Sequence, residues 1–289
     1  MRKKPGFGSL LIIGGHEDKT GEKMILRLLA KKIGKSGKIV VATIASELPE
    51  ELFDDYERVF RGLGIRHVHH LRIESREEAS HDAKVAVLRD ADAVFFTGGD
   101  QLRITSQLGD TPIFSRIHEI YAAGGVIAGT SAGASVMTET MLVSGTGSES
   151  QRIDSSLKLG PGFGLLPGVI VDQHFAERGR ISRLLSAVAQ NPRILGIGID
   201  EDSAILVQRG RFQVVGTNAV YVVDGSKITF TNITESDPDS PVGVYGIRLH
   251  VMNQADTFDL KNRKPRYHPE KVLREQLGLP EEREPEKES

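Results

Sequence analysis

Hydrophobic and polar positions alternate along the first half of the chain in a pattern that predicts strands followed by helices. Apolar runs typical of buried strands occupy residues 9–14, 38–45, 65–73, 93–97 and 126–128. Between these runs, apolar residues recur at helical spacing over 21–33, 52–60, 79–88 and 113–120. Strands that alternate with helices in this way predict an α/β fold with a mostly parallel central sheet and helices on both of its faces.

The pattern changes in the second half of the chain. A strand is predicted over 168–172 and a helical stripe over 181–188. Beyond Leu195, short β runs are predicted at 196–199, 204–207, 212–215, 220–223, 227–230 and 243–251. Turn dipeptides such as Asp224-Gly225 separate them, so we expect antiparallel strands in the C-terminal third. These strands either complete one mixed sheet or add a small second sheet.

The distribution of residue types along the chain predicts how it is divided. No linker interrupts the alternating pattern, so we expect one α/β domain over residues 1–265. Residues 266–289 are rich in charge, and the last ten read PEEREPEKES, with no apolar residue. A segment of this composition cannot bury a core, and we therefore expect a charged C-terminal tail that is partly disordered.

Composition excludes several functional classes. Lys and Arg number 37 against 39 Asp and Glu, so the chain has no overall basic field for nucleic acid. Cysteine is absent, which excludes disulfides, thiolate metal sites and a cysteine nucleophile. No apolar run approaches the roughly 18 residues of a membrane span. The apolar stretch 10–13 is also too short for a signal peptide, which needs about 7 residues or more, and we expect a cytoplasmic protein.

Three glycine-rich junctions follow predicted strands. Their sequences are GGHED at 14–18, GGDQ at 98–101 and GTSAGA at 129–134. Because ligands of parallel sheets bind beyond the carboxyl ends of the strands, these junctions predict the floor of an active site. None of them matches a dinucleotide-binding or P-loop motif, so no nucleotide cofactor is expected.

The third junction matches the G-x-S-x-G pattern of a nucleophile elbow, with Ser131 at its centre. Small flanking residues allow the strained turn that exposes a serine hydroxyl between a strand and a helix. The N–H of Ala132 would then lie at a helix N-terminus, where it can stabilise an oxyanion. The alternative is that small residues only allow the strand to pack closely on the helix.

A nucleophilic serine needs a base, and His174 is the best placed of the nine histidines. It follows a predicted strand, although a structural histidine in the core would give the same pattern. His16 lies in the first glycine junction and can face the same site. His67, His69 and His70 have no carboxylate at ligand spacing, so we interpret them as surface or edge-strand residues and expect no metal.

Several acidic residues are candidates for the group that orients the histidine. Asp200, Glu201 and Asp202 all follow a predicted strand, where acids also form solvated turns. Asp172 and Glu177 compete with them because they are close to His174 in the sequence. Spacing alone therefore leaves the third member of a Ser-His-acid triad open.

Basic residues follow the histidine at Arg178, Arg180 and Arg183. A solvated helix face is the ordinary interpretation of such a run. Next to a reactive centre, however, guanidinium groups bind carboxylates in a bidentate manner, which would suit a zwitterionic substrate.

Taken together, these motifs resemble those of the cyanophycinases, serine peptidases related to aspartyl dipeptidase and, more distantly, to class I glutamine amidotransferases. The resemblance covers about residues 8–265 and rests on GGHEDK at 14–19, FTGGDQ at 96–101, GTSAGA at 129–134, DQHF at 172–175 and GIDE at 198–201. It implies an amidotransferase-like, flavodoxin-like fold, a homodimer, and hydrolysis of the polymer cyanophycin to β-Asp-Arg dipeptides without metal or cofactor.

The resemblance also implies roles for individual residues. Ser131 would be the nucleophile, His174 the base and Glu201 the orienting acid, with the N–H groups of Gly99 and Ala132 forming the oxyanion hole. The implied substrate-binding residues are Gln101, Asp172, Gln173, Arg178, Arg180 and Arg183.

Asp172 precedes His174 by two residues, so on a strand both side chains face the same side. We therefore expect Asp172 to contact the guanidinium of the substrate. The rival interpretations are a peptidase that acts on aspartyl or isoaspartyl dipeptides and a non-catalytic binding protein of amidotransferase-like fold.

Overall fold

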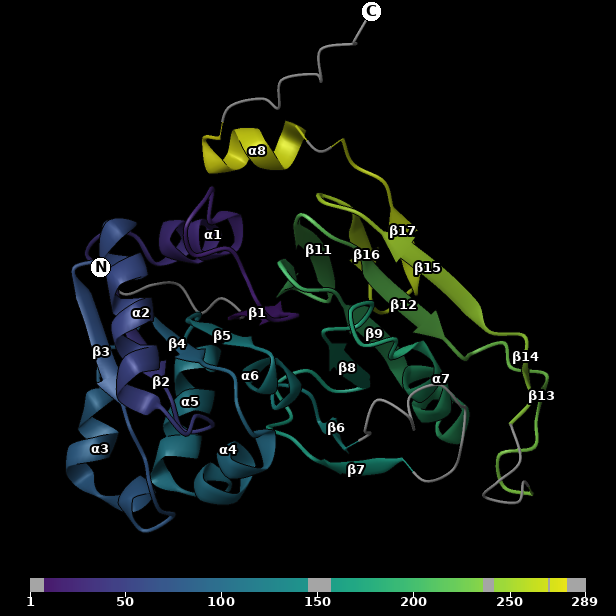
Figure 1. Cartoon of the computed structure of the whole chain (residues 1–289), viewed down its shortest axis with the longest axis horizontal. Helices are drawn as coiled ribbons and strands as arrows, with labels where there is room; N and C mark the ends of the chain where they lie inside the picture. Colours follow the sequence, from purple (N-terminus) through teal and green to yellow (C-terminus); the bar gives the residue numbers. More distant parts are fainter. Residues whose placement is uncertain (1–7, 145–156, 236–241, 270, 280–289) are drawn as a thin grey trace, which may run out of the picture.

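The structure is a computed structural model that describes residues 8–144, 157–235, 242–269 and 271–279. Its largest unit is a mixed nine-stranded sheet ordered β17-β16-β11-β10-β1-β5-β4-β2-β3 (Figure 1). The parallel strands are β1 (Ser9–Ile13), β5 (Val126–Thr130), β4 (Ala93–Phe96), β2 (Lys38–Ala42) and β3 (His67–Leu71). Antiparallel strands extend the sheet beyond β1: β10 (Ser203–Gln208), β11 (Arg211–Gly216), β16 (Thr257–Asp259) and β17 (Lys264–Arg266).

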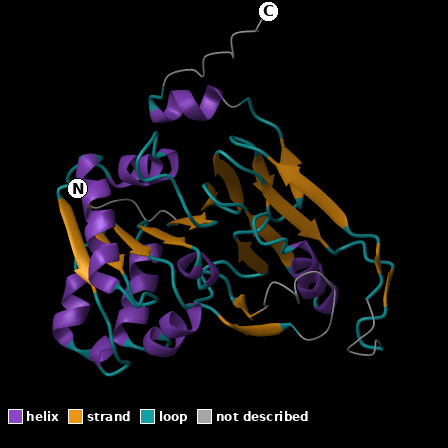
Figure 2. Ribbon diagram, in the orientation of Figure 1, coloured by secondary structure: helices purple, strands orange, loops and turns teal. Residues whose placement is uncertain are grey.

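Helices cover both faces of the parallel strands (Figure 2). Alternate residues of these strands belong to two hydrophobic clusters, one on each face of the sheet. Leu11 and Ile13 of β1 face α1 (Met24–Ile33), α2 (Pro49–Gly62) and α8 (Lys271–Leu277). Leu10 and Ile12 face the opposite cluster. Its helices are the 3₁₀ helix η1 (Glu78–Ser80), α3 (Asp82–Val87), α4 (Gln101–Leu108), α5 (Pro112–Ala122) and α6 (Ala132–Ser135). Strands buried on both faces explain why their sequences are continuously apolar.

A second sheet of four strands packs on the side of α6. Its order is β15 (Arg248–Met252), β12 (Val220–Asp224), β9 (Leu195–Ile199) and β8 (Val169–Gln173), with β8 and β9 parallel. Ile197 and Val222 join the same cluster as Leu10, while Leu184 of α7 (Ile181–Gln190) covers the other face. Two short pairs complete the described strands: β6 (Thr140–Ser144) with β7 (Lys158–Pro161), and β13 (Phe230–Thr231) with β14 (Val244–Tyr245).

Side-chain caps fix the starts of the two helices that follow β4. The carboxylate of Asp100 accepts a hydrogen bond from the N–H of Leu102 at 2.8 Å and thereby begins α4. Thr111 caps α5 in the same way, and Pro112 occupies the first turn. Both caps satisfy N–H groups that have no acceptor within the helix.

The predicted fold class is confirmed, and both alternatives for the C-terminal strands occur together. Strands β10, β11, β16 and β17 extend the first sheet, whereas β9, β12 and β15 contribute to the second. His67, His69 and His70 lie on the edge strand β3, as expected. The strand predicted at 227–230 is reduced to β13, and α4 and the β6–β7 pair were not predicted.

The expected C-terminal tail, residues 266–289, contains the helix α8 and begins with the last residue of β17. Leu273 and Leu277 are buried in the cluster that contains α1, and Arg274 donates to Glu22 at 2.8 Å. Residues 271–277 are therefore helical and not disordered. Residues 280–289, for which disorder was also expected, lie outside the described residues, and for them the expectation stays a prediction. Among the helices described, none has the combined length and apolar character needed to cross a membrane.

Candidate active site

Five loops at the carboxyl ends of parallel strands meet at one place between the two sheets. The nine-stranded sheet contributes the loops that carry His16 after β1, Gly99 after β4 and Ser131 after β5. The four-stranded sheet contributes His174 after β8 and Glu201 after β9. The site is therefore built across a sheet-to-sheet boundary, at the strand ends where ligands of α/β folds bind.

Ser131, His174 and Glu201 form a continuous hydrogen-bonded chain. The Oγ of Ser131 lies 2.9 Å from Nε2 of His174, and Nδ1 of His174 lies 2.6 Å from Oε1 of Glu201. Because an ionised carboxylate only accepts hydrogen bonds, Nδ1 of His174 carries the proton. Its Nε2 is thus free to accept the proton of the Ser131 hydroxyl.

The backbone at Ser131 has the strained geometry of a nucleophile elbow. Ser131 has φ 53 and ψ −112, and its N–H donates to the carbonyl oxygen of Ile13 at 3.1 Å. A Cβ at Gly129 would lie 2.3 Å from the carbonyl oxygen of Gly133, so no larger residue fits there. The small residues in the G-x-S-x-G motif hence allow this tight turn, and the serine in it contacts a histidine.

The loop after β1 supports the histidine. The N–H of His174 donates to the carbonyl oxygen of Gly14 at 2.9 Å, and the backbone of His174 is left-handed, with φ 48. A Cβ at Gly15 would lie 2.2 Å from Cε1 of His174, so the imidazole occupies the space that a side chain would take. The carbonyl oxygen of Gly15 also accepts a hydrogen bond from the N–H of Asp202 at 2.9 Å, which joins this loop to the acidic turn after β9.

Of the three acids in that turn, Glu201 is the one in contact with His174. Asp200 accepts the N–H of Ala176 at 2.9 Å. Asp202 accepts the N–H of Asp18 at 2.8 Å and the hydroxyl of Thr217 at 2.8 Å. These two acids stabilise loops, which leaves Glu201 as the acid that orients the histidine in this geometry.

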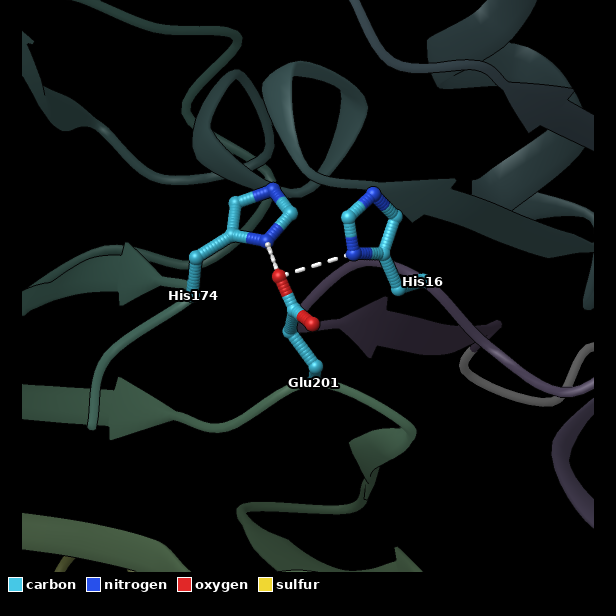
Figure 3. A group of neighbouring side chains, drawn as sticks. All are labelled: His16, His174 and Glu201. Atoms are coloured by element: carbon cyan, nitrogen blue, oxygen red, sulfur yellow. Dashed lines mark hydrogen bonds and ion pairs between the residues drawn. The ribbon is translucent and has the colours of Figure 1, made fainter. Parts of the chain in front are cut away.

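His16 faces the site, as the sequence indicated. Its Nδ1 lies 2.8 Å from the same oxygen of Glu201 that accepts from His174 (Figure 3). The two rings are edge-to-face, with centroids 5.2 Å apart, but the side chain of His16 is 73% exposed and that of His174 only 5%. Among the described residues, His16, His174 and Glu201 also place their ligand atoms within 4.8 Å of one another, close enough for a metal ion. Hydrogen bonding to one oxygen accounts for this closeness.

Burial and hydrogen bonding have opposite effects on the pKa of His174 and on the pKa of Glu201. Burial lowers the pKa of the His174 imidazole, and Glu201 opposes this effect in part. Burial alone would raise the pKa of Glu201, but hydrogen bonds from His16 and His174 outweigh it and hold the pKa below its usual value. At neutral pH, His174 is therefore a neutral base beside a charged carboxylate.

The triad opens into a cavity of about 510 Å³. Its lining residues come from both sheets and from α2: His16, Glu17, Lys19, Leu52, Tyr56, Gly99, Gln101, Thr130, Ser131, Val143, Gln173, His174, Arg178, Arg180 and Arg183. A Cβ at Gly98 would lie 3.4 Å from Cβ of Ser131, so the Gly98-Gly99 loop is next to the nucleophile. Ala132 begins α6, and its N–H has no acceptor within that helix.

Hydrogen bonds to neighbouring groups fix the two glutamines of the cavity. The amide nitrogen of Gln101 donates to the carbonyl oxygen of Leu142 at 3.0 Å, and the amide oxygen of Gln173 accepts from the hydroxyl of Ser135 at 3.1 Å. Within the described residues, the oxygen of Gln101 and the nitrogen of Gln173 have no hydrogen-bond partner and can bind a ligand.

Asp172 does not line this cavity, which corrects the expectation that it contacts a substrate guanidinium. Its side chain is fully buried and accepts hydrogen bonds from Nε of Arg183 at 2.8 Å and from Nη1 of Arg180 at 3.3 Å. The expectation assumed strand alternation up to His174, but β8 ends at Gln173 and the left-handed backbone turns His174 away from that pattern. Asp172 instead holds two arginines in place.

The three arginines lie at the cavity as expected, in different environments. Arg180 and Arg183 are buried, and Arg178 is exposed. Burial lowers the pKa of Arg180 to about 10, with Asp172 opposing the shift, so its guanidinium remains charged at neutral pH. A buried cation fixed by an internal carboxylate is suited to bind an anionic group of a ligand.

Glu17 was assigned no role from the sequence, yet it is 4% exposed and lines the cavity. Its Oε1 accepts the hydroxyl of Tyr56 at 2.5 Å, and its Oε2 accepts the hydroxyl of Thr130, next to the nucleophile, at 2.6 Å. Burial and the charge of Glu17 both raise the pKa of Tyr56. The position of Glu17 inside the first glycine motif could have identified it as a site residue. Tyr56 could not be identified in this way, because its spacing is that of the other apolar residues on the buried face of α2.

Comparison with known proteins places this geometry in a family. Residues 10–215 match the sequence profile of peptidase family S51. A protein named cyanophycinase from Nostoc sp. is 40% identical over 258 residues, covering 88% of this chain and 86% of the relative. Another cyanophycinase, from Geminocystis herdmanii, is 36% identical over 260 residues, covering 89% and 95%. The crystal structure of a peptidase from an acI-B1 Actinobacterium matches with a TM-score of 0.61 at 26% identity, covering 76% of this chain and 92% of that one.

Proposed function

The chain belongs to peptidase family S51 and is a serine peptidase, and from this premise we propose that it acts as a cyanophycinase. The substrate is cyanophycin, a polyaspartate backbone with an arginine on each β-carboxyl group. The reaction is hydrolysis from a chain end to release β-Asp-Arg dipeptides. The observation that carries this proposal is the hydrogen-bonded chain from Ser131 through His174 to Glu201 beside a cavity with three arginines.

In the first half of the reaction, the Oγ of Ser131 attacks the scissile carbonyl carbon while Nε2 of His174 takes the hydroxyl proton. The imidazolium that forms is stabilised by Glu201, which hydrogen-bonds to Nδ1. His174 then gives the proton to the leaving amine as the carbon–nitrogen bond breaks. An ester between Ser131 and the acyl group remains.

The tetrahedral intermediate carries a negative oxygen that the N–H groups of Gly99 and Ala132 are suited to bind. Gly99 lines the same cavity as Ser131, and Ala132 follows Ser131 directly at the positive end of a helix. Each such donor contributes about 3–4 kcal/mol in other acyl-transfer enzymes. In the second half of the reaction, His174 takes a proton from water, and the resulting attack releases the acid and restores the serine.

Charge in the cavity supports a zwitterionic substrate. Arg180 and Arg183 are held by Asp172 at the wall of the cavity, where they can bind the carboxylates of a cyanophycin unit. The guanidinium of the unit needs an anion, and Asp172 does not line the cavity. Glu17 does line it, and each of its oxygens can accept a further hydrogen bond beside the one from Tyr56 or Thr130. We therefore assign to Glu17 the contact that was expected of Asp172.

The direct test is incubation of the purified protein with insoluble cyanophycin, followed by mass spectrometry of the soluble products. We expect β-Asp-Arg dipeptides from the wild-type chain and none from the Ser131→Ala variant. Release of free arginine or of larger fragments would reject the dipeptide product. Cleavage only of small aspartyl dipeptides would favour the dipeptidase activity instead.

A further inference from the structure

A second hollow adjoins the active-site cavity, between the start of α1 and the exposed side of α2. Its volume is about 670 Å³. We call it the basic groove, and it is lined by Lys19, Thr20, Lys23, Arg27, Asp55, Arg58, Val59, Gly62 and Leu63. Lys19 also lines the active-site cavity, so the two hollows lie on either side of this residue.

The groove has an excess of positive charge. Four of its lining residues are cations, namely Lys19, Lys23, Arg27 and Arg58, and one is an anion, Asp55. Asp55 forms an ion pair with Arg58 at 3.0 Å, one turn along α2. Three cations therefore remain, in a protein whose overall charge is −2.

Hydrogen bonds hold these cations without neutralising them. The ammonium of Lys23 donates to the carbonyl oxygen of Thr20 at 2.9 Å, and Nε of Arg27 donates to that of Glu22 at 3.3 Å. The ammonium of Lys19 lies 4.1 Å above the ring of Tyr56. In the described part of the chain, none of the three forms an ion pair with a carboxylate within 4.0 Å.

The nearby acids have other partners. The carboxylate of Asp18 accepts backbone N–H groups of Thr20, Gly21 and Lys23 at 2.7–2.9 Å. Glu22 accepts from Arg274 of α8. Asp18 keeps its negative charge, which also acts on Lys23. Neither Asp18 nor Glu22 lines the groove, however, so the excess of cations along its wall is available to an external anion.

The direction of the groove follows α2 away from the nucleophile. Leu52 and Tyr56 line the active-site cavity, whereas Val59 and Leu63 line the groove. From residue 52 to residue 63 the helix rises about 16 Å, which is the length of roughly five residues of extended chain. A polymer with one end at Ser131 therefore has room for several further units along the groove.

We propose that the basic groove is a second binding site, which holds the carboxylates of polymer units that are not being cleaved. The proposal rests on the proposed function, since a dipeptide substrate would not reach the groove. Each cyanophycin unit carries a free carboxylate on its arginine, and a row of such groups matches Lys19, Lys23 and Arg27. The groove would raise affinity for the polymer without taking part in the chemistry.

The variant that tests this is Lys23→Asn/Arg27→Gln. Lys23 has φ 53, a conformation that asparagine tolerates, and neither residue lines the active-site cavity. The matched control is Arg209→Asn/Lys227→Gln, which removes two exposed cations outside the groove, one of them also at positive φ. The single variant Arg27→Gln serves as a second test if the double variant does not fold.

Two measurements distinguish the groove from the active site. The first is kcat/KM on the polymer and on a two-unit fragment. We expect the double variant to lose about three- to tenfold on the polymer, as for two exposed ion pairs, and to match wild type on the fragment. The second is calorimetric binding of sodium polyaspartate to Ser131→Ala protein with and without the groove substitutions, where we expect a similar loss. The control variant should behave as wild type in both.

Equal polymer kinetics for the groove and control variants would overturn the proposal, and so would equal losses on polymer and fragment. Polyaspartate binding that is unchanged by the groove substitutions would overturn it as well. If the wild-type chain releases no dipeptide from cyanophycin, the proposed function fails, but the polyaspartate measurement still decides on the groove.

Discussion

Glu201 accepts hydrogen bonds from two imidazoles through a single oxygen, and this sharing affects how strongly it can act on His174. The exposed His16 competes with the buried His174 for the same negative charge. The neighbouring His16 lowers the pKa of His174. The basicity of His174 thus depends on burial, on Glu201 and on the neighbouring His16.

The first prediction concerns the pH dependence of catalysis. Only neutral His174 can accept the serine proton, and burial lowers its pKa, so kcat/KM should fall with decreasing pH through a midpoint below the usual 6.5. Glu201→Gln removes a group that raises this pKa, so the midpoint should move to still lower pH. The plateau should fall by about 10²–10⁴-fold because the imidazolium loses its counter-charge.

The measurement is a pH–rate profile from about pH 4 to pH 8 for wild type and variant. Asp202→Asn is the matched control, since it removes a carboxylate from the same turn that has no contact with His174. A loss in Asp202→Asn as large as in Glu201→Gln would contradict the assignment of the acid. A midpoint that moves to higher pH in Glu201→Gln would contradict the electrostatic argument.

The second prediction concerns Asp172, which the structure places beneath the cavity. Asp172→Asn leaves two buried guanidinium groups without their counter-charge, and we expect the free energy of unfolding to fall by about 3–5 kcal/mol. Arg178→Gln changes an exposed cation of the same cavity and should leave stability within about 0.5 kcal/mol while raising KM. Urea unfolding monitored by circular dichroism measures the stability of both variants, and steady-state kinetics measure the KM of Arg178→Gln. An Asp172→Asn protein as stable as wild type would mean that the two arginines are not held by this carboxylate.

At the scale of elements, the sequence predicted the strands and the junctions at their ends better than the elements between them. Ser131 and His174 were found because a glycine-rich or polar turn after an apolar run marks the carboxyl end of a buried strand. Helix α4 was not predicted, because its segment QLRITSQL lacks a clear apolar stripe and its start depends on the cap from Asp100. The role of Asp172 could not be predicted from the sequence, because the left-handed backbone at His174 ends the strand alternation on which the prediction relied.

The third prediction tests the C-terminal helix against the segment that follows it. Leu273 of α8 has no exposed surface and packs in the cluster of α1, so Leu273→Ala should lower the free energy of unfolding by about 2–5 kcal/mol. Deletion of residues 280–289 should leave the melting temperature nearly unchanged, because the segment has no apolar residue to bury. Calorimetric melting curves of both proteins make the comparison. A larger decrease in the deletion than in Leu273→Ala would mean that the last residues contribute to the fold.

At the scale of the whole molecule, charge is distributed unevenly between the surface and the site. The chain has a net charge of −2, yet cations outnumber carboxylates among the residues that line the cavity. Arg180 and Arg183 share the buried carboxylate of Asp172, so the excess positive charge at the cavity comes from Lys19 and Arg178. A concave site with an excess of one charge attracts oppositely charged ligands even when the molecule as a whole is nearly neutral. The two sheets both contribute to this site, so its charge pattern depends on how they pack together.

The last prediction follows from this distribution. Cyanophycin presents a carboxylate and a guanidinium in every unit and so can satisfy both the arginines and Glu17. Polyaspartate offers carboxylates alone, and it should bind as a competitive inhibitor while being cleaved slowly, because Glu17 remains without its cation. Casein carries carboxylates and guanidinium groups without this repeat, and it should not be cleaved. Product release from the three polymers at equal mass, with Ser131→Ala protein as the blank, makes the comparison. Equal rates on all three would mean that the cavity does not distinguish charge and that the chain is a general serine peptidase.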